Sequence, residues 1–209
     1  NGLNQAAEFL GITCNDNREY STFCQFVFGT IKNFNTEHNG KYFGHKVTFN
    51  TECVPAESLA IKNYNWDKQN GYWVPDDENL YNSYIYDAHD DTSILDKIAM
   101  QGGQIAKSID GGQASHLNLQ DNLDKQQYTK LLEYAVQQGN SYITFNVPQT
   151  QCAKCGFIAK HPFDVCPVCN STAVTQWTRI IGYLRPIKAW SDARQQEGSH
   201  RMFAKKDTI

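Results

Sequence analysis

The sequence predicts an α/β fold that carries a small metal-binding module near its C-terminal end. The first observation is alternation: residues 46–53 and 141–147 are rich in strand formers, while residues 123–138 repeat apolar side chains at helical spacing. Strand, helix and strand in this order are typical of an α/β barrel or a sheet edge, not of a helical bundle. The second observation is a pair of Cys-x-x-Cys turns within residues 152–169.

Composition narrows the classes of function. The chain has 209 residues, enough for one sizeable core or two small ones, and its formal net charge is −3. That charge gives no electrostatic footprint for nucleic acid. Seven cysteines, four of them at metal spacing, fit a reducing cytosol better than a secreted, disulfide-linked domain. With no signal peptide and no long apolar run, we expect a cytoplasmic protein that binds neither nucleic acid nor membrane.

The N-terminal half is predicted to hold two helices and a strand, followed by a long irregular excursion. Phe23, Val27 and Ile31 recur at helical spacing, and residues 46–53 alternate between apolar and polar side chains. The excursion is rich in Asn, Asp and Tyr and has no steady period. The expected elements are a helix over residues 5–11, a helix over 16–35, a strand over 46–53 and irregular structure over 62–90.

The segment Val54–Ser58 is predicted to turn that strand into a helix. Pro55 suits the first helical position, and the free amides of the first turn, with the Ser58 hydroxyl, would form a phosphate cradle. The alternative is an ordinary helix start in which Glu57 complements the helix dipole. Composition alone favours the ordinary helix start.

The C-terminal half is predicted to continue the alternation. Gly102 and Gly139 would end helices, and Asp121 would cap the helix between them. His116 is interpreted as a structural histidine rather than a site residue. The expected elements are a helix over residues 91–101, a glycine turn and strand over 110–119, a helix over 123–138, a strand over 141–147, a short helix over 190–197 and a basic, loosely held tail over 201–209.

The two cysteine pairs predict a closed metal site. Two facing Cys-x-x-Cys turns form the tetrahedral four-sulfur cage of structural zinc. Gly156 and Asn170 directly follow each pair, and both residue types tolerate the positive φ that turns backbone amides toward sulfur. Disulfides, free thiols and iron in place of zinc remain alternatives. The candidate ligands are Cys152, Cys155, Cys166 and Cys169.

A glycine follows the metal module in an apolar and aromatic context, Arg179-Ile-Ile-Gly182-Tyr-Leu-Arg-Pro186. Taken alone, one glycine indicates only a turn or a close backbone approach. Its surroundings resemble the RVxGY-type motif of glycyl radical enzymes. Together with the four cysteines, the segment resembles the C-terminal part of anaerobic (class III) ribonucleoside-triphosphate reductases. Further segments similar to that family are Val54–Ser58, Gly111–Gln113, His116–Leu119 and the tail from Trp190.

The resemblance implies a fold and a division of the chain. Residues 1–150 would be the C-terminal portion of a ten-stranded α/β barrel of the glycyl radical enzyme type. Residues 151–178 would be a zinc-ribbon-like module with four cysteine ligands. Residues 179–209 would be the glycyl radical loop and tail, in which Tyr183 and the two isoleucines would pack the loop and exclude water and oxygen.

The resemblance also implies a reaction. A radical-SAM activase with an iron–sulfur cluster would install a radical on Gly182 using S-adenosylmethionine. The radical would generate a thiyl that reduces ribonucleoside triphosphates to deoxyribonucleotides, as DNA replication requires. The family's reductant is formate or a thiol system. The implied phosphate-binding residues are Pro55, Ala56, Glu57 and Ser58.

The thiyl cysteine of the family lies upstream of the segments matched here. Cys14, Cys24 and Cys53 stand in the wrong contexts to replace it. Because the chain begins at Asn1 without a methionine, we expect a complementary N-terminal reductase chain or segment, and a homodimer of the complete enzyme. The alternatives are a glycyl radical spare-part protein, which would not need a phosphate turn or zinc, and a non-catalytic zinc-ribbon binding module.

Overall fold

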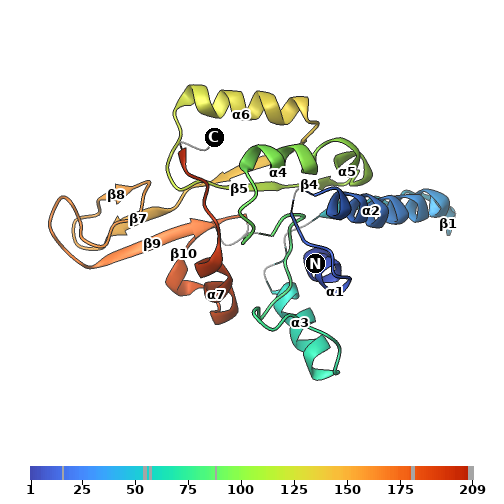
Figure 1. The fold of residues 1–209 in the computed structure, drawn as a ribbon, viewed down its shortest axis with the longest axis horizontal. Helices are drawn as coiled ribbons and strands as arrows, with labels where there is room; N and C mark the ends of the chain where they lie inside the picture. Colours follow the sequence, from blue (N-terminus) through green and yellow to red (C-terminus); the bar gives the residue numbers. More distant parts are fainter. Residues whose placement is uncertain (16, 54–55, 57, 88, 180–181, 207–209) are drawn as a thin grey trace.

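The computed structural model describes residues 1–15, 17–53, 56, 58–87, 89–179 and 182–206, and within them the chain is a mixed α/β fold of short strands and helices (Figure 1). The elements in order are α1 (Leu3–Phe9), α2 (Arg18–His38), β1 (Gly40–Tyr42), β2 (His45–Val47), β3 (Glu52–Cys53), α3 (Leu59–Gln69), α4 (Ile94–Gln101), α5 (Gly103–Ser108), β4 (Gly112–Gln113), β5 (Ser115–Asn118), α6 (Lys125–Gln137), β6 (Ile143–Asn146), β7 (Gln149–Cys152), β8 (Ile158–Ala159), β9 (Val174–Arg179), β10 (Leu184–Pro186), the 3-10 turn η1 (Ile187–Ala189) and α7 (Asp192–His200).

The body of the molecule contains two parallel strand pairs. β3 pairs with β4, and β5 pairs with β6 through four residues in register, from Ser115 opposite Ile143 to Asn118 opposite Asn146. α6 connects β5 to β6 and lies along them in Figure 1, which makes a β-α-β unit. The alternation predicted from the sequence is therefore confirmed, whereas closure into a ten-stranded barrel stays a prediction.

A hydrophobic core lies between this β-α-β unit and α4. Its members come from alternate positions of β5 and from the inner faces of α4 and α6, as a half-buried strand and amphipathic helices require. The buried residues are Ile94, Ile98, Leu117, Leu119, Leu123, Leu131 and Ala135. Burial of these side chains fixes the position of β5 and β6, and β6 leads directly into the metal module.

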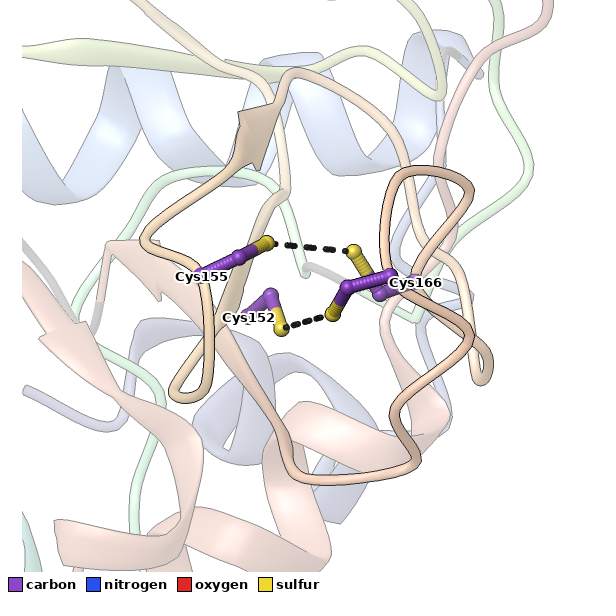
Figure 2. A group of neighbouring side chains, drawn as sticks. Cys152, Cys155 and Cys166 are labelled. Atoms are coloured by element: carbon purple, nitrogen blue, oxygen red, sulfur yellow. Dashed lines mark hydrogen bonds between the residues drawn. The ribbon is translucent and has the colours of Figure 1, made fainter.

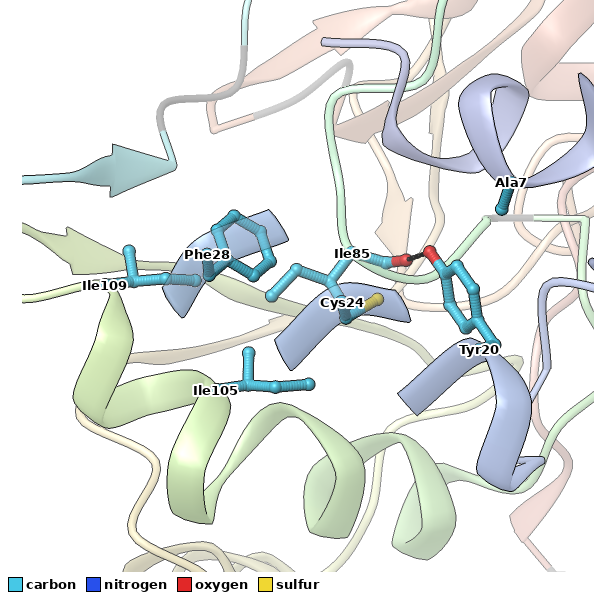
Figure 3. Close-up of a cluster of buried hydrophobic side chains, with 7 residues drawn as sticks. All are labelled: Ala7, Tyr20, Cys24, Phe28, Ile85, Ile105 and Ile109. Carbon is cyan, nitrogen blue, oxygen red and sulfur yellow. Dashed lines mark hydrogen bonds between the residues drawn. The ribbon is translucent and has the colours of Figure 1, made fainter. Parts of the chain in front are cut away.

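A second core joins the N-terminal helices to α5 (Figure 3). The Tyr20 hydroxyl donates to the Ile85 carbonyl, and the Asn4 side-chain amide donates to the same carbonyl at 3.2 Å. Cys24 is fully buried here, so the interpretation of a core cysteine is confirmed. The residues drawn in Figure 3 are Ala7, Tyr20, Cys24, Phe28, Ile85, Ile105 and Ile109. None of the helices in the described part of the chain is long and apolar enough to cross a membrane.

A four-stranded antiparallel sheet extends away from the body. Its order is β10-β9-β7-β8, and Figure 1 shows β7, β8 and β9 reaching to the left of the molecule. β9 crosses the sheet from Val174, opposite Cys152, to Arg179, opposite Leu184. One strand therefore connects the cysteine module to the glycine segment.

The strand predicted over residues 46–53 is wrong as a single element. β1 and β2 form a hairpin around Phe43 and Gly44, both at positive φ, and only the short β3 pairs in the body. The predicted strand is interrupted at residues 48–51, because side chains there satisfy backbone amides in place of a neighbouring strand: Phe49 N donates to Asn39 Oδ1 at 2.7 Å, and Thr51 N donates to Asp110 Oδ1 at 2.9 Å. The helix expected from Pro55 begins at Leu59 and continues to Gln69, so the irregular region starts later than predicted.

One predicted helix terminus is confirmed, although a further helix follows it, and another is wrong. Gly102 ends α4, but α5 follows at once, because the Gly103 amide donates to the Gln138 carbonyl at 2.8 Å. A Cβ on Gly102 would lie 2.0 Å from the same oxygen, so this position needs glycine. Asp124, not Asp121, caps α6 through a reciprocal capping box with Gln127.

The C-terminal tail is not loosely held where the structure describes it. Arg201 is only 9% exposed, and Ala204 forms a parallel bridge with Leu119. The Ala204 amide donates to the Asn118 carbonyl at 3.0 Å, and its carbonyl accepts from the Gln120 amide at 2.9 Å. The tail adds a short strand segment beside β5, which a basic composition alone does not reveal.

Candidate functional site

Each cysteine pair forms a tight turn closed by equivalent backbone hydrogen bonds. The Gly156 amide donates to the Cys152 carbonyl at 3.0 Å, and the Asn170 amide donates to the Cys166 carbonyl at 2.9 Å. Gly156 and Asn170 have φ of 77° and 54°, as their residue types predict. In this conformation successive amides point toward a sulfur, which stabilises a thiolate.

The four sulfur atoms lie together, as the spacing predicts. Figure 2 shows the side chains of Cys152, Cys155 and Cys166 turned toward a shared centre. The Sγ atoms of Cys152 and Cys169, and those of Cys155 and Cys166, are each 3.6 Å apart, and all four lie within 4.8 Å of one another. A disulfide is about 2.05 Å long, so these are free thiols. A tetrahedral ion with bonds of about 2.3 Å to sulfur has sulfur–sulfur edges of about 3.8 Å, which fits the observed spacing.

The charges of the cluster also fit a cation. Hydrogen bonds from the amides of Cys155 and Lys154 lower the pKa of Cys152 to about 6. The Ser171 amide lowers the pKa of Cys169, but desolvation and the neighbouring sulfurs outweigh it and raise that pKa to about 12. Four thiolates at this spacing repel one another unless a metal ion neutralises them. Zinc or iron would satisfy this donor set.

Gly182 lies in the connection between β9 and β10. It is exposed, and the Arg179 guanidinium donates to its carbonyl. Among the described residues, no other heavy atom lies within 4 Å of the position that a Cβ on Gly182 would take, and its φ is outside the left-handed region. Tyr183 is 50% exposed in this chain, so its shielding of the glycine stays a prediction. The two preceding isoleucines lie outside the described residues.

The expected phosphate turn is described only in part. Pro55 and Glu57 lie outside the described residues. Ser58 is exposed and precedes α3 without a side-chain capping hydrogen bond within the described structure, so its hydroxyl is open to a ligand. The Ala56 carbonyl accepts from Arg194 Nη2 at 2.8 Å and from Ser83 Oγ at 3.3 Å. The turn is therefore tied to α7 at the other end of the chain.

His116 lines a cavity of about 460 Å³ between β5, α4 and the tail. Its ring centroid is 4.9 Å from that of Tyr84. Desolvation first, and then the charges of Arg201 and Arg179, lower the pKa of His116 to about 4. The buried Tyr84 hydroxyl has no hydrogen-bond partner within the described part of the chain. The cavity thus presents a neutral imidazole and an available hydroxyl.

Sequence reasoning missed two polar clusters. One is formed by Arg194, Glu197 and Arg201 around α7, whose spacing of three and four residues is a helical ion-pair signal. In the other, His89 Nδ1 lies 3.3 Å from Glu78 Oε1 and His89 Nε2 lies 3.2 Å from the Glu197 carbonyl. Because residues 62–90 show no periodicity, no signal in the sequence places Glu78 and His89 together.

A family model described as anaerobic ribonucleoside-triphosphate reductase matches residues 1–203. Comparison with curated proteins gives no match. Among solved structures, one described as an anaerobic ribonucleotide reductase is 25% identical with a TM-score of 0.81, covering 98% of this chain and 33% of its own.

Two structures of the anaerobic ribonucleotide reductase from Thermotoga maritima are also similar. The one in complex with dATP and CTP has a TM-score of 0.75 and 25% identity, covering 94% of this chain and 32% of its own. The one with MES in the active site has a TM-score of 0.70 and 26% identity, covering 84% and 28% respectively. The chain therefore spans about a third of the length of the solved proteins it resembles.

Proposed function

The chain belongs to the anaerobic ribonucleoside-triphosphate reductase family, and from this premise we propose that it forms the radical-bearing C-terminal part of such an enzyme. Residues 1–150 contribute to the catalytic barrel, residues 151–178 bind zinc, and residues 179–209 form the glycyl radical loop and tail. The zinc is structural, since four protein sulfurs leave no open coordination position.

The observation that carries the proposal is the environment of Gly182. Glycine is normally needed where φ is positive or where a Cβ would clash. Gly182 has neither requirement within the described structure, unlike Gly102, whose Cβ would lie 2.0 Å from a carbonyl oxygen. The Cα of Gly182 is thus accessible among the described residues, which supports a chemical role for it in a chain of this family.

That role follows from the bonding at the Cα. When the activase removes one hydrogen atom, the C–H bond breaks homolytically and leaves a radical between an electron-donating amide nitrogen and an electron-withdrawing carbonyl. The radical is delocalised along the backbone. Without a Cβ the centre can become planar, and hydrogen return from a thiol restores the C–H bond. The remainder of the enzyme covers the exposed loop and protects it from oxygen.

The stored radical serves the reduction of a ribonucleotide. The Gly182 radical takes a hydrogen atom from a cysteine of the complementary chain or segment, which becomes a thiyl. The thiyl removes the 3′ hydrogen of a ribonucleoside triphosphate, and the 2′ hydroxyl leaves as water. Formate or a thiol system supplies the two electrons. Cys24 does not fill the thiyl role because it is buried in the core that joins the N-terminal helices to α5.

The substrate phosphates bind at residues 55–58. The exposed Ser58 hydroxyl and the start of α3 support this assignment, because unpaired amides at a helix N-terminus favour anions. The complete enzyme is a cytoplasmic homodimer that is activated by the radical-SAM protein.

The experiment is an electron paramagnetic resonance (EPR) spectrum of the protein, with its complementary part, after anaerobic incubation with activase, S-adenosylmethionine and reductant. We expect a doublet near the free-electron position, and cleavage at Gly182 after brief exposure to air, seen by mass spectrometry. A competent activase that gives no doublet, with an intact chain after air, would favour a zinc-binding module without radical chemistry. A doublet without nucleotide reduction would favour a spare-part protein.

A further inference from the structure

Three charged side chains around α7 are buried and face one another. Arg194 is 2% exposed and Arg201 is 9% exposed, and the Glu197 side chain between them is 10% exposed. Burying a charge is unfavourable unless it is paired and hydrogen-bonded. These residues therefore hold their places through specific partners.

The Glu197 carboxylate joins the two arginines. Arg201 Nε donates to Glu197 Oε1 at 2.6 Å, and Arg201 Nη2 donates to Oε2 at 2.7 Å, a bidentate pair. Arg194 Nη1 lies 3.6 Å from the same Oε2. Arg201 also stacks over Trp190, with its guanidinium carbon 5.1 Å from the ring centroid. Arg194, Glu197 and Arg201 form one unit, called here the α7 ladder.

The two ends of the α7 ladder contact the two functional segments. Arg201 Nη1 donates to the Arg179 carbonyl at 2.6 Å, at the end of β9. Arg194 Nη2 donates to the Ala56 carbonyl at 2.8 Å, within the proposed phosphate turn. Arg179 is three residues before Gly182 and donates to its carbonyl. A continuous series of contacts thus runs from the glycine to the turn.

From these contacts we infer that Arg194, Glu197 and Arg201 are positioning residues that fix the Gly182 loop relative to the nucleotide-binding turn. The inference rests on the proposed function. Both end contacts are made to backbone carbonyls, so they fix the path of each segment independently of its side chains. Hydrogen transfer between the loop and a thiol requires close alignment, and a misplacement of about 1 Å lowers rates about a hundredfold.

The energetics favour positioning over simple stabilisation. Buried Arg–Glu–Arg groups add little net stability, and apolar side chains of similar volume often replace them without loss. What apolar side chains cannot supply is a directed bond to each of two carbonyls. Arg201→Met and Arg194→Met each remove the donors and keep much of the apolar stem. Each also leaves the Glu197 carboxylate with one arginine fewer, which lowers stability, so activity is measured per folded, radical-bearing chain to separate positioning from stability.

The test uses the complete reductase with its activase, and measures radical per chain by EPR, turnover per radical, and the KM for the nucleotide. We expect Arg201→Met to lower turnover per radical about 10- to 100-fold. We expect Arg194→Met to raise the KM about tenfold, as loss of one charged hydrogen bond near the turn predicts. Lys188→Met removes an exposed cation from the same region and should leave all three quantities unchanged.

The outcomes are distinguishable. If wild type forms the radical but both arginine variants fold with unchanged turnover per radical and KM, the α7 ladder is only structural and the inference is overturned. If Arg201→Met does not fold, Arg201→Lys decides, because it keeps charge and stem but loses the bidentate geometry; it should show the same loss per radical, and unchanged turnover would overturn the inference. If wild type forms no radical, the proposed function fails, and this inference with it.

Discussion

The cysteine turns lie at one end of β9, and the glycine hairpin (β9, β10 and the connection that carries Gly182) begins at the other end. The two are held in place in different ways. Most backbone hydrogen bonds of the two cysteine turns join residues at most five positions apart, such as the Cys152 amide to the Phe157 carbonyl, and one longer contact joins the Ala153 amide to the Ala173 carbonyl on the neighbouring strand. The base of the glycine hairpin is held by Asn146 and Arg201, which are 33 and 22 residues from Arg179. A site built from short-range contacts can be recognised in a motif, whereas one positioned by long-range contacts depends on the rest of the fold.

The largest effect should come from Gly182→Ala, which tests whether the hairpin exists for chemistry. We expect complete loss of the EPR doublet and of nucleotide reduction, because the methyl group obstructs hydrogen abstraction and planarity. The melting temperature should change little, since the added Cβ meets no described atom within 4 Å and φ is not left-handed.

Gly111→Ala is the matched control for this prediction. A Cβ there would lie 2.8 Å from the Thr51 carbonyl oxygen, so this variant should be destabilised by its effect on the β3–β4 pair. A Gly182→Ala protein that still reduced nucleotides would show that the hairpin glycine is an ordinary turn residue.

Cys166→Ser should have the next largest effect and tests the local character of the cysteine module. We expect loss of about one zinc per chain and a loss of stability on the order of several kcal/mol, confined to β7, β8 and β9. Metal analysis and amide hydrogen exchange would measure both. Cys53→Ser, away from the cluster, should retain the metal. Equal metal content in the two variants would contradict the assignment of Cys166 as a metal ligand.

A smaller effect concerns pH, at the face where His116 meets Arg201. Burial lowers the pKa of folded His116 to about 4, below the 6.5 of an unperturbed histidine, so the unfolded chain binds the proton first as the pH falls. The resulting stability is fully present above pH 6.5 and is lost as the pH falls through 4, amounting to about 3 kcal/mol.

Thermal melts of the assembled protein between pH 4 and 7 would measure this effect. His116→Gln should show a flatter dependence over that window, because the glutamine side chain does not titrate. Identical pH profiles for the variant and the wild type would show that His116 does not contribute to acid sensitivity.

The smallest effect is expected for Ser58→Ala, at the turn that the α7 ladder contacts. Loss of one hydroxyl donor should weaken nucleotide binding roughly tenfold, without changing the zinc content or the radical yield. A nucleotide titration of the complete enzyme would measure it, with Ser21→Ala on α2 as control. Unchanged nucleotide affinity would show that this turn is an ordinary helix start that does not bind the substrate phosphates.

The sequence was informative where the signal is local. The positive φ of Gly156 and Asn170 follows from residue type, and the helices α2 and α6 follow from periodicity, although α2 buries Tyr20, Cys24 and Phe28 and leaves the predicted Ile31 exposed. The Asp124-x-x-Gln127 capping box is also a local signal in the sequence, and the prediction of Asp121 as the cap overlooked it. By contrast, Phe43 at positive φ and the contact from Arg194 to Ala56 are fixed by tertiary structure, so no pattern predicts them.

The short bridge between Ala204 and Leu119 has a consequence for damage by oxygen. If air cuts the backbone at Gly182, the severed C-terminal piece keeps its strand contact beside β5 and the bonds from Arg201 to Arg179. The broken protein would then migrate as an intact one under native conditions and separate only in denaturant. Such a nicked molecule would still carry its zinc. Neither its native size nor its metal content would therefore reveal that the enzyme is inactive.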